Sequence, residues 1–311
     1  PPADAQTVIV IVLDTGRYDL FDEATMPRLF ARRGDGLYVT VAANVAGWTL
    51  PTTLTLMSGV RLEEQGLDPQ GHALPEGAYT GLPRILHDAG WYTSLNTTNN
   101  LVSHNLADGF DAVTEHGTSW GLAEQGTEVV SALAASDPTV SSLVWLQAMN
   151  LHVPYDKLDP SCQADAVAAD AACPEAVIHA TGDGSFTPGE FSTLNKDETE
   201  ACRAALQSAQ RCAATKLDTD LDALIAALPP DALVIVTTDH GEGWLDPRIE
   251  HNWGASAKLT RGFLLLLHPS LAGEVVPLAS QADLAPTVLD FVGVERADLV
   301  FEGGPVRQGQ A

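Results

Sequence analysis

Short apolar runs that alternate with helical segments constrain the fold of this 311-residue chain more than any other feature. The clearest run is VIVIVL, residues 8–13, which is apolar on both faces of a strand. Strands of this kind are typical of a mostly parallel sheet that is covered by helices. We predict strands at residues 8–13, 91–96, 143–149, 233–238 and 263–267. The alternation therefore predicts an α/β fold, a three-layer α/β/α sandwich around a mostly parallel sheet.

Helix signals lie between these strands. Gly90 marks the end of one helix after Asp88, and a second helix is expected near residues 126–135. Residues 198–228 contain no glycine or proline and predict one long helix, which Pro229 ends. Two more helices, at 50–59 and 283–292, have a proline in the first turn.

The chain shows no linker or internal repeat that would divide it. We expect one catalytic domain over residues 1–311. Residues 155–198 lack periodicity and are rich in Ala, Asp, Gly and Pro. A loop this long inside a compact domain is usually functional or disordered, so we expect an insertion beside the active site.

The charge of the chain is strongly negative, at −25 from 41 acidic and 16 basic residues. Such a surface repels nucleic acid and anionic lipid, so neither is expected as a partner. No stretch approaches ~20 consecutive apolar residues, so no membrane span is expected. An anionic substrate would need a local positive charge, which a bound metal can supply.

The four cysteines, Cys162, Cys173, Cys202 and Cys212, lie in one segment without C-x₂-C spacing. Two disulfides and an extracytoplasmic location (periplasmic, secreted or surface-anchored) are the favoured interpretation, and free buried thiols are the alternative. On one continuous helix Cys202 and Cys212 would lie about 15 Å apart, from a rise of ~1.5 Å per residue. A disulfide needs Cα atoms within ~7 Å, so each should instead pair with Cys162 or Cys173. The chain begins at Pro1, as a mature or trimmed form would, so it carries no readable targeting signal.

Polar residues follow three of the predicted strands directly. Asp14 follows the first strand, Asn150 and His152 follow residues 143–149, and Asp239 and His240 follow residues 233–238. Ligands of an open parallel sheet bind at the carboxyl ends of its strands. Each residue also has a simpler interpretation, as a turn cap, a solvated acid or a packed histidine. Their convergence on one edge nevertheless predicts a functional site.

A hydroxyl group and another histidine can join this edge. Thr49 opens the predicted helix at 50–59, where free backbone N–H groups and the positive end of the helix dipole suit a tetrahedral oxyanion. The alternative is that Thr49 only caps the helix. His251 lies in a loop after His240 that can return to the same edge. Two carboxylates, an imidazole and a hydroxyl form a plausible O/N site for a divalent cation, which would activate the threonine.

Six short segments in order resemble the alkaline phosphatase superfamily, specifically its sulfatase-like branch. They are IVIVLDTGRYD at 9–19, WTLPT at 48–52, MSG at 57–59, NLHVPY at 150–155, TDHGE at 238–242 and DLAPTVLD at 283–290. Each is modest alone, but their order and spacing together are specific and cover nearly the whole chain. The resemblance implies an alkaline-phosphatase-like fold.

The resemblance also implies roles for the residues at the strand ends. Asp14, Asp239 and His240 would bind a divalent metal together with Thr49, the nucleophile. His152 and His251 would contact the oxyanion or the leaving group of the substrate. We also expect Asn150 to contribute to substrate binding, although many relatives carry aspartate at that position. An imidazole ligand favours Zn or Mn over Ca or Mg. One cation is expected; a second, near His152 and His251, is left open.

The chain departs from the sulfatase pattern at two places. Sulfatases carry Cys or Ser in a C/S-x-P-x-R motif that is converted to formylglycine. Here Thr49 occupies the position of the nucleophile and Thr53 the position of the arginine. Conversion to formylglycine is therefore impossible. Thr15 follows Asp14 where sulfatases usually have a second aspartate. These features resemble the phosphodiesterase, phosphonate hydrolase and phosphoglycerol transferase relatives.

The sequence therefore predicts a metal-dependent hydrolase of phosphate mono- or diesters that works through a covalent phospho-Thr49 intermediate. The alternatives are a phosphoglycerol- or phosphoethanolamine-transferase-like enzyme, a sulfuric ester hydrolase, and a non-catalytic binding module of the same fold. A small phosphate- or sulfate-ester substrate is the expected partner. The natural substrate and the oligomeric state are not encoded in a recognisable motif.

Overall fold

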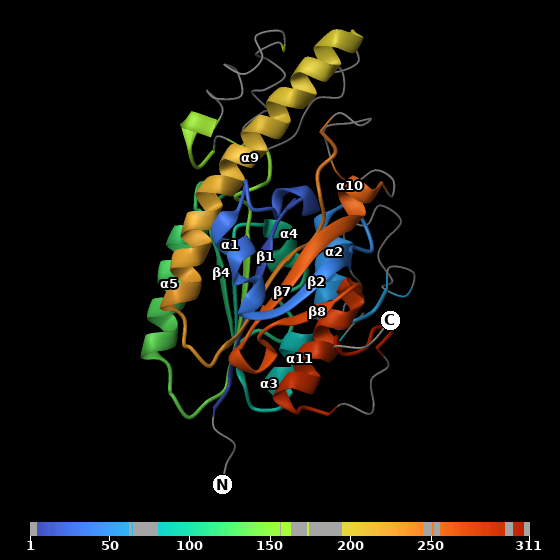
Figure 1. The fold of residues 1–311 in the computed structure, drawn as a ribbon. Coiled ribbons are helices and arrows are strands. Elements are labelled where there is room, and N and C mark those ends of the chain that lie inside the picture. Colours follow the sequence, from blue (N-terminus) through green and yellow to red (C-terminus); the bar gives the residue numbers. More distant parts are fainter. Residues whose placement is uncertain are drawn as a thin grey trace.

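A central sheet organises the molecule (Figure 1). The computed structural model describes residues 5–61, 64, 80–155, 157–162, 173, 195–244, 251, 256–295 and 301–307. The nine-stranded sheet has the order β4-β3-β5-β1-β6-β7-β2-β8, and β9 also pairs with β2. The strands are β1 (Thr7–Leu13), β2 (Gly36–Ala43), β3 (Tyr92–Thr97), β4 (Ala112–Glu115), β5 (Ser142–Ala148), β6 (Leu233–Thr238), β7 (Arg261–Leu267), β8 (Glu274–Val276) and β9 (Ala279–Ser280).

The sheet is mostly parallel, as predicted. In the described part of the chain β7 is antiparallel to β6 and β2, and the other strand pairs are parallel. β1 lies at the centre, between β5 and β6. The carboxyl ends of β1, β5, β6 and β3 therefore meet at one edge of the sheet.

Helices cover both faces of the sheet (Figure 1). One face is packed by α1 (Pro27–Ala31), α5 (Leu122–Ala135) and α9 (Lys196–Ala227), and the other by α2 (Thr49–Ser58), α3 (Leu82–Asp88), α4 (Asn100–Asn105) and α11 (Leu284–Val292). The short α10 (Ala257–Thr260) precedes β7. Single 3₁₀ turns occupy Tyr18–Leu20, Arg32–Gly34, Pro269–Leu271 and Gln281–Asp283. This arrangement confirms the predicted three-layer sandwich.

β1 shows why its sequence is apolar at every position. Ile9 and Ile11 belong to the hydrophobic cluster on the α5 and α9 face, whereas Val8 and Val10 belong to the cluster on the α2 and α11 face. All four side chains are fully buried. Burial of each such side chain stabilises the fold by about 1.5–3 kcal/mol. Because its side chains point alternately to the two faces of the sheet, β1 contributes to both hydrophobic clusters.

The five predicted strands are all present, and their ends either match the prediction or are shifted by at most two residues. β2, β4, β8 and β9 were not predicted. β4 is short and largely exposed, and β2 alternates buried and partly exposed residues, so neither has the continuous apolar run of a central strand. The predicted helix that ends near Gly90 is α3, and Gly90 has a φ of 87°, which favours glycine.

The 32-residue α9 is continuous, as the lack of glycine and proline predicted. Its Cys212 is bonded to Cys162 and its Cys202 to Cys173. The prediction that the two helix cysteines do not pair with each other is confirmed, and the structure settles which partner each one has. Most of the predicted insertion at 155–198 lies outside the described residues. Among the described helices, none combines the length and the apolar composition needed to cross a membrane.

Candidate active site

Thr49 is the first residue of α2 rather than its cap. The N-cap is Trp48, which has extended backbone angles and makes no side-chain capping bond. The alternative that Thr49 serves only as a helix cap is therefore wrong. Its hydroxyl is buried and lies 3.4 Å from Asp14 Oδ2 and 3.3 Å from His240 Nε2.

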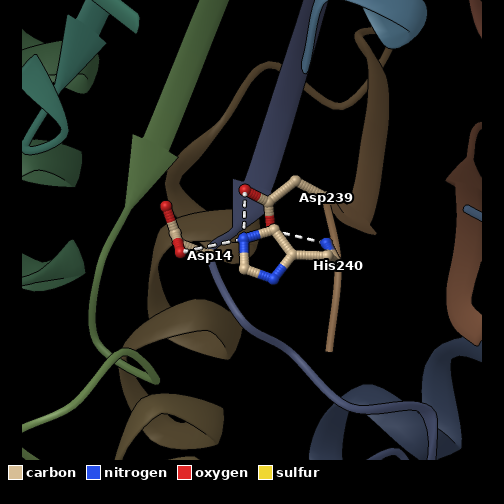
Figure 2. Close-up of side chains that lie close together, drawn as sticks. All are labelled: Asp14, Asp239 and His240. Atoms are coloured by element: carbon tan, nitrogen blue, oxygen red, sulfur yellow. Dashed lines mark hydrogen bonds and ion pairs between the residues drawn. The ribbon is translucent and has the colours of Figure 1, made fainter. Parts of the chain in front are cut away.

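Three fully buried side chains form the centre of the site (Figure 2). Asp14 follows β1, and Asp239 and His240 follow β6. His240 Nε2 lies 3.5 Å from Asp239 Oδ2 and 3.8 Å from Asp14 Oδ1. One potential ligand atom from each residue falls within 4.8 Å of the others, a spacing that can hold a metal ion.

The tautomer of His240 follows from its backbone contact. Its Nδ1 lies 2.9 Å from the carbonyl oxygen of Gly241, which can only accept a hydrogen bond. Nδ1 therefore carries the hydrogen, and Nε2 presents a lone pair to the two carboxylates. Burial lowers the pKa of His240 to about 3, so the ring is neutral, as a metal ligand must be.

The two carboxylates need a positive charge between them. Burial, together with the charge of Asp14, raises the pKa of Asp239 well above its ordinary value. Burial also opposes ionisation of Asp14, but the pKa of Asp14 is lowered from its ordinary value, and a hydrogen bond from Asn99 contributes to this shift. Asp14 Oδ1 is buried and has no hydrogen-bond partner. A buried acceptor next to a second carboxylate and a neutral imidazole fits a divalent cation.

The backbone after β1 is strained where it meets this cluster. Thr15 has a φ of 58°, which is uncommon for a β-branched residue. This conformation lets the Thr15 N–H donate to Asp239 Oδ1 at 3.1 Å, and the His240 N–H donates to the same oxygen at 2.7 Å. Strained backbone of this kind is concentrated at functional sites, where it orients groups in advance.

Two amide side chains that the sequence analysis missed complete the cluster. Asn99 Nδ2 donates to Asp14 Oδ2 at 2.7 Å and lies 3.4 Å from Thr49 Oγ1. Gln147 Nε2 contacts Asp14 Oδ2 at 3.4 Å and Asp239 Oδ2 at 3.3 Å. Asn99 could have been found, because it follows β3 at the same edge of the sheet as the other site residues.

His152 and His251 lie beside the cluster. The ring of His251 is 4.6 Å from that of His240 and 5.0 Å from that of His152, measured between centroids. His251 Nδ1 lies 3.4 Å from the buried Glu242 carboxylate. His152 Nδ1 lies 2.7 Å from the carbonyl of Val153, so its Nε2 presents a lone pair. Burial lowers the pKa of His152 to about 4.

Lys157, another residue missed in the sequence, brings a basic group to this region. Its Nζ donates to the carbonyl oxygen of His152 at 2.9 Å. Burial lowers the pKa of Lys157 to about 7, and the charge of Asp14 opposes this shift. The available signal was its place two residues after the HVPY segment at 152–155.

Asn150 is not brought into the cluster. Its Oδ1 accepts a hydrogen bond from the N–H of Leu122 at 3.1 Å, at the start of α5. The amide oxygen is thus engaged with a helix terminus, and the expected contact with substrate stays a prediction. The structure brings together Asp14, Thr49, Asp239 and His240, with His152 and His251 next to them.

No protein-family model and no curated protein matches this chain by sequence. Solved structures do match. The phosphonate monoester hydrolase of Agrobacterium radiobacter superposes with a TM-score of 0.74 and 18% identity, over 97% of this chain and 76% of that one. The putative sulfatase YidJ of Bacteroides fragilis matches with a TM-score of 0.70 and 16% identity, over 94% and 75%. The lipoteichoic acid synthase LtaP of Listeria monocytogenes matches with a TM-score of 0.66 and 16% identity, over 97% and 75%.

These similarities confirm the predicted resemblance at the level of the fold. The chain has the alkaline-phosphatase-like fold that these structures share. At these identities the similarity establishes the architecture, and the chemistry must be argued from the site itself.

Proposed function

We propose that this protein is a metal-dependent hydrolase of phosphate esters with Thr49 as its nucleophile. The observation that carries the proposal is the placement of the Thr49 hydroxyl within 3.5 Å of both Asp14 and His240. The hydroxyl is buried and also lies 3.4 Å from Asn99 Nδ2. The structural neighbours include phosphonate monoester hydrolases, which supports the class of reaction.

Asp14, Thr49, Asp239 and His240 would hold the cation. When bound, the cation would lower the pKa of the Thr49 hydroxyl and offset negative charge on the phosphoryl oxygens. Thr49 is the first residue of α2, and the N-terminus of a helix favours an oxyanion. Asn99 Nδ2, which already contacts Asp14 and Thr49, orients the nucleophile.

The reaction would proceed in two displacements at phosphorus. In the first, Thr49 Oγ1 bonds to phosphorus, the bond to the alcohol oxygen breaks, and the proton from Thr49 ends on the leaving alcohol. In the second, water bonds to phosphorus, the Thr49–phosphorus bond breaks, and a proton from water returns to Thr49. We assign His152 Nε2 as the proton carrier, because Nδ1 donates to the carbonyl oxygen of Val153 and the Nε2 lone pair can then accept a proton.

The charges near Thr49 favour a substrate with a single negative charge. A divalent cation would balance Asp14 and Asp239. Among the described residues Lys157 adds one basic group, whereas the Arg17 guanidinium is already held by Asp19 at 2.6 Å. Phosphodiesters and phosphonate monoesters carry one charge at neutral pH, so we expect them to be turned over faster than dianionic phosphate monoesters.

A transferase is the second candidate. The same phospho-Thr49 intermediate could pass to an alcohol instead of water, and the similarity to a lipoteichoic acid synthase supports this alternative. A sulfuric ester hydrolase is less well supported, because a plain threonine ester lacks the hemiacetal route by which formylglycine releases sulfate. The two disulfides support an extracytoplasmic location for either enzyme.

One experiment separates these functions. The purified protein is analysed for bound metal and assayed with a chromogenic phosphodiester, phosphate monoester and sulfate ester, with and without added glycerol. Hydrolysis of the phosphodiester that requires the metal supports the proposal. Release that rises with glycerol, with transfer of the phosphoryl group to it, supports a transferase. A metal-loaded protein without turnover of any ester would indicate a binding module.

A further inference from the structure

Gln147 is a fully buried polar residue in the middle of the sheet. It lies near the carboxyl end of β5, where it is in register with Val12 of β1 and Thr97 of β3. Its neighbours along β5 are buried as well. A buried amide in such a strand must find polar partners, because an unpaired one is costly.

The partners of Gln147 are the two carboxylates of the active site. Its Nε2 lies 3.4 Å from Asp14 Oδ2 and 3.3 Å from Asp239 Oδ2. A primary amide nitrogen carries two hydrogens, so it can direct one to each carboxylate. Both contacts are long, at 3.4 and 3.3 Å.

The other end of the amide fixes its orientation. Carboxylate oxygens accept hydrogen bonds, so the nitrogen must face them and the oxygen must face away. The hydroxyl of Thr53 donates to Gln147 Oε1 at 3.5 Å. Thr53 stands where the sulfatase motif has an arginine, so in this chain a neutral hydroxyl–amide pair occupies the space beside the carboxylates.

This arrangement leaves Asp14 Oδ1, which lies 3.8 Å from His240 Nε2, available to a cation, whereas Asp239 Oδ2 contacts both Gln147 Nε2 and His240 Nε2. Asp14 Oδ2 is held by Gln147 and Asn99, while Asp14 Oδ1 has no hydrogen-bond partner. A neutral amide orients the carboxylates without cancelling their charge, whereas a lysine or arginine would compete with the cation. Groups that orient metal ligands in this way affect affinity strongly.

We propose that Gln147 is a positioning residue for the metal centre, which holds Asp14 and Asp239 at the separation and rotation that a divalent cation requires. The inference rests on the metal site of the proposed function. It concerns affinity and geometry of binding, and it does not depend on which ester is cleaved.

The test is titration of chelator-treated protein with Mn²⁺, followed by calorimetry and by electron paramagnetic resonance of the bound ion. Gln147→Leu and Gln147→Met keep the approximate volume and remove both donors. We expect the Kd for Mn²⁺ to rise about tenfold or more, with an altered spectrum of the bound ion. The matched control is Gln125→Leu. Gln125 is equally buried, but its Nε2 donates to Asn96 Oδ1 and to the backbone oxygen of Gln147 rather than to a carboxylate.

A third variant guards against misfolding at position 147. Thr53→Val removes the hydroxyl that orients the amide and should raise the Kd about threefold, since both donors remain. The inference is overturned if the folded Gln147 variants bind Mn²⁺ within about threefold of the wild type. It is also overturned if Gln125→Leu raises the Kd for Mn²⁺ as much as the Gln147 variants do. If neither Gln147 variant folds, an unchanged Kd in Thr53→Val overturns it. Failure of the wild-type protein to bind Mn²⁺ or Zn²⁺ would instead remove the metal site, and the proposed function with it.

Discussion

Replacing Thr49 by alanine should separate catalysis from folding. The change removes the hydroxyl that lies 3.4 Å from Asp14 and 3.3 Å from His240. Loss of a covalent nucleophile typically costs at least about a thousandfold in turnover. At ~1.36 kcal/mol per tenfold, that raises the barrier by about 4 kcal/mol.

The cost to folding should be far smaller. Thr49 does not cap α2, because Trp48 is the N-cap, and the three side-chain contacts of its hydroxyl are long, at 3.3–3.4 Å. Loss of a hydrogen bond of this kind costs about 1 kcal/mol. Alanine has a higher helix propensity than threonine, which offsets part of that cost by up to ~0.7 kcal/mol. The variant should therefore unfold in urea within about 1 kcal/mol of the wild type.

Thr52→Ala is the matched control. Thr52 lies on the same helix and is fully buried, but its hydroxyl donates only to the backbone oxygens of Trp48 and Thr49, at 2.8 and 2.9 Å. Its kcat/KM on the chromogenic phosphodiester should stay within about tenfold of the wild type. The reasoning is refuted if Thr49→Ala also retains activity within that range, or if the two variants lose activity equally.

Three further outcomes are expected. Chelation of the metal should abolish turnover and lower the Tm, because the two buried carboxylates then repel each other, and Mn²⁺ or Zn²⁺ should restore both; an unchanged Tm and rate would contradict the metal site. Replacing Cys162 and Cys212 by alanine removes a disulfide between residues 50 positions apart in the sequence. The free energy of unfolding in urea should fall by about 2–4 kcal/mol, and an unchanged unfolding midpoint would contradict this. Lys157→Met should raise KM about tenfold with a smaller change in kcat, if its ammonium group attracts the anionic substrate; an unaltered KM would remove Lys157 from the site.

The sequence allowed much of this site to be predicted, because parallel strands end at a common edge. Asp14 and Asp239 each follow a continuous apolar run, so topology alone brings them together. Thr49 required more, since the choice between cap and nucleophile depends on where α2 begins. The structure places Trp48 at the N-cap, so Thr49 is not the cap, and its role as nucleophile stays a proposal.

The site residues that the sequence analysis missed lie at positions where the sequence pattern indicates a functional role only weakly. Gln147 lies inside a predicted strand, and only its burial shows that the polar side chain must have a partner. Lys157 lies in a segment without periodicity, where no predicted helix or strand indicates which way its side chain points. Asn150, by contrast, was at the expected strand end, yet its amide oxygen bonds to the first turn of α5. A position at the edge of a sheet thus does not determine where a side chain points.

The most direct test of the central claim is to trap the covalent intermediate. The metal-loaded protein is mixed with a chromogenic phosphodiester, quenched in acid during turnover, and digested for peptide mapping by mass spectrometry. We predict that the peptide containing Thr49 carries, on that side chain, the phosphoryl group left after the first alcohol has departed, and that Thr49→Ala shows no such adduct. Steady turnover with no adduct on Thr49, or with an adduct on another side chain, would contradict the account.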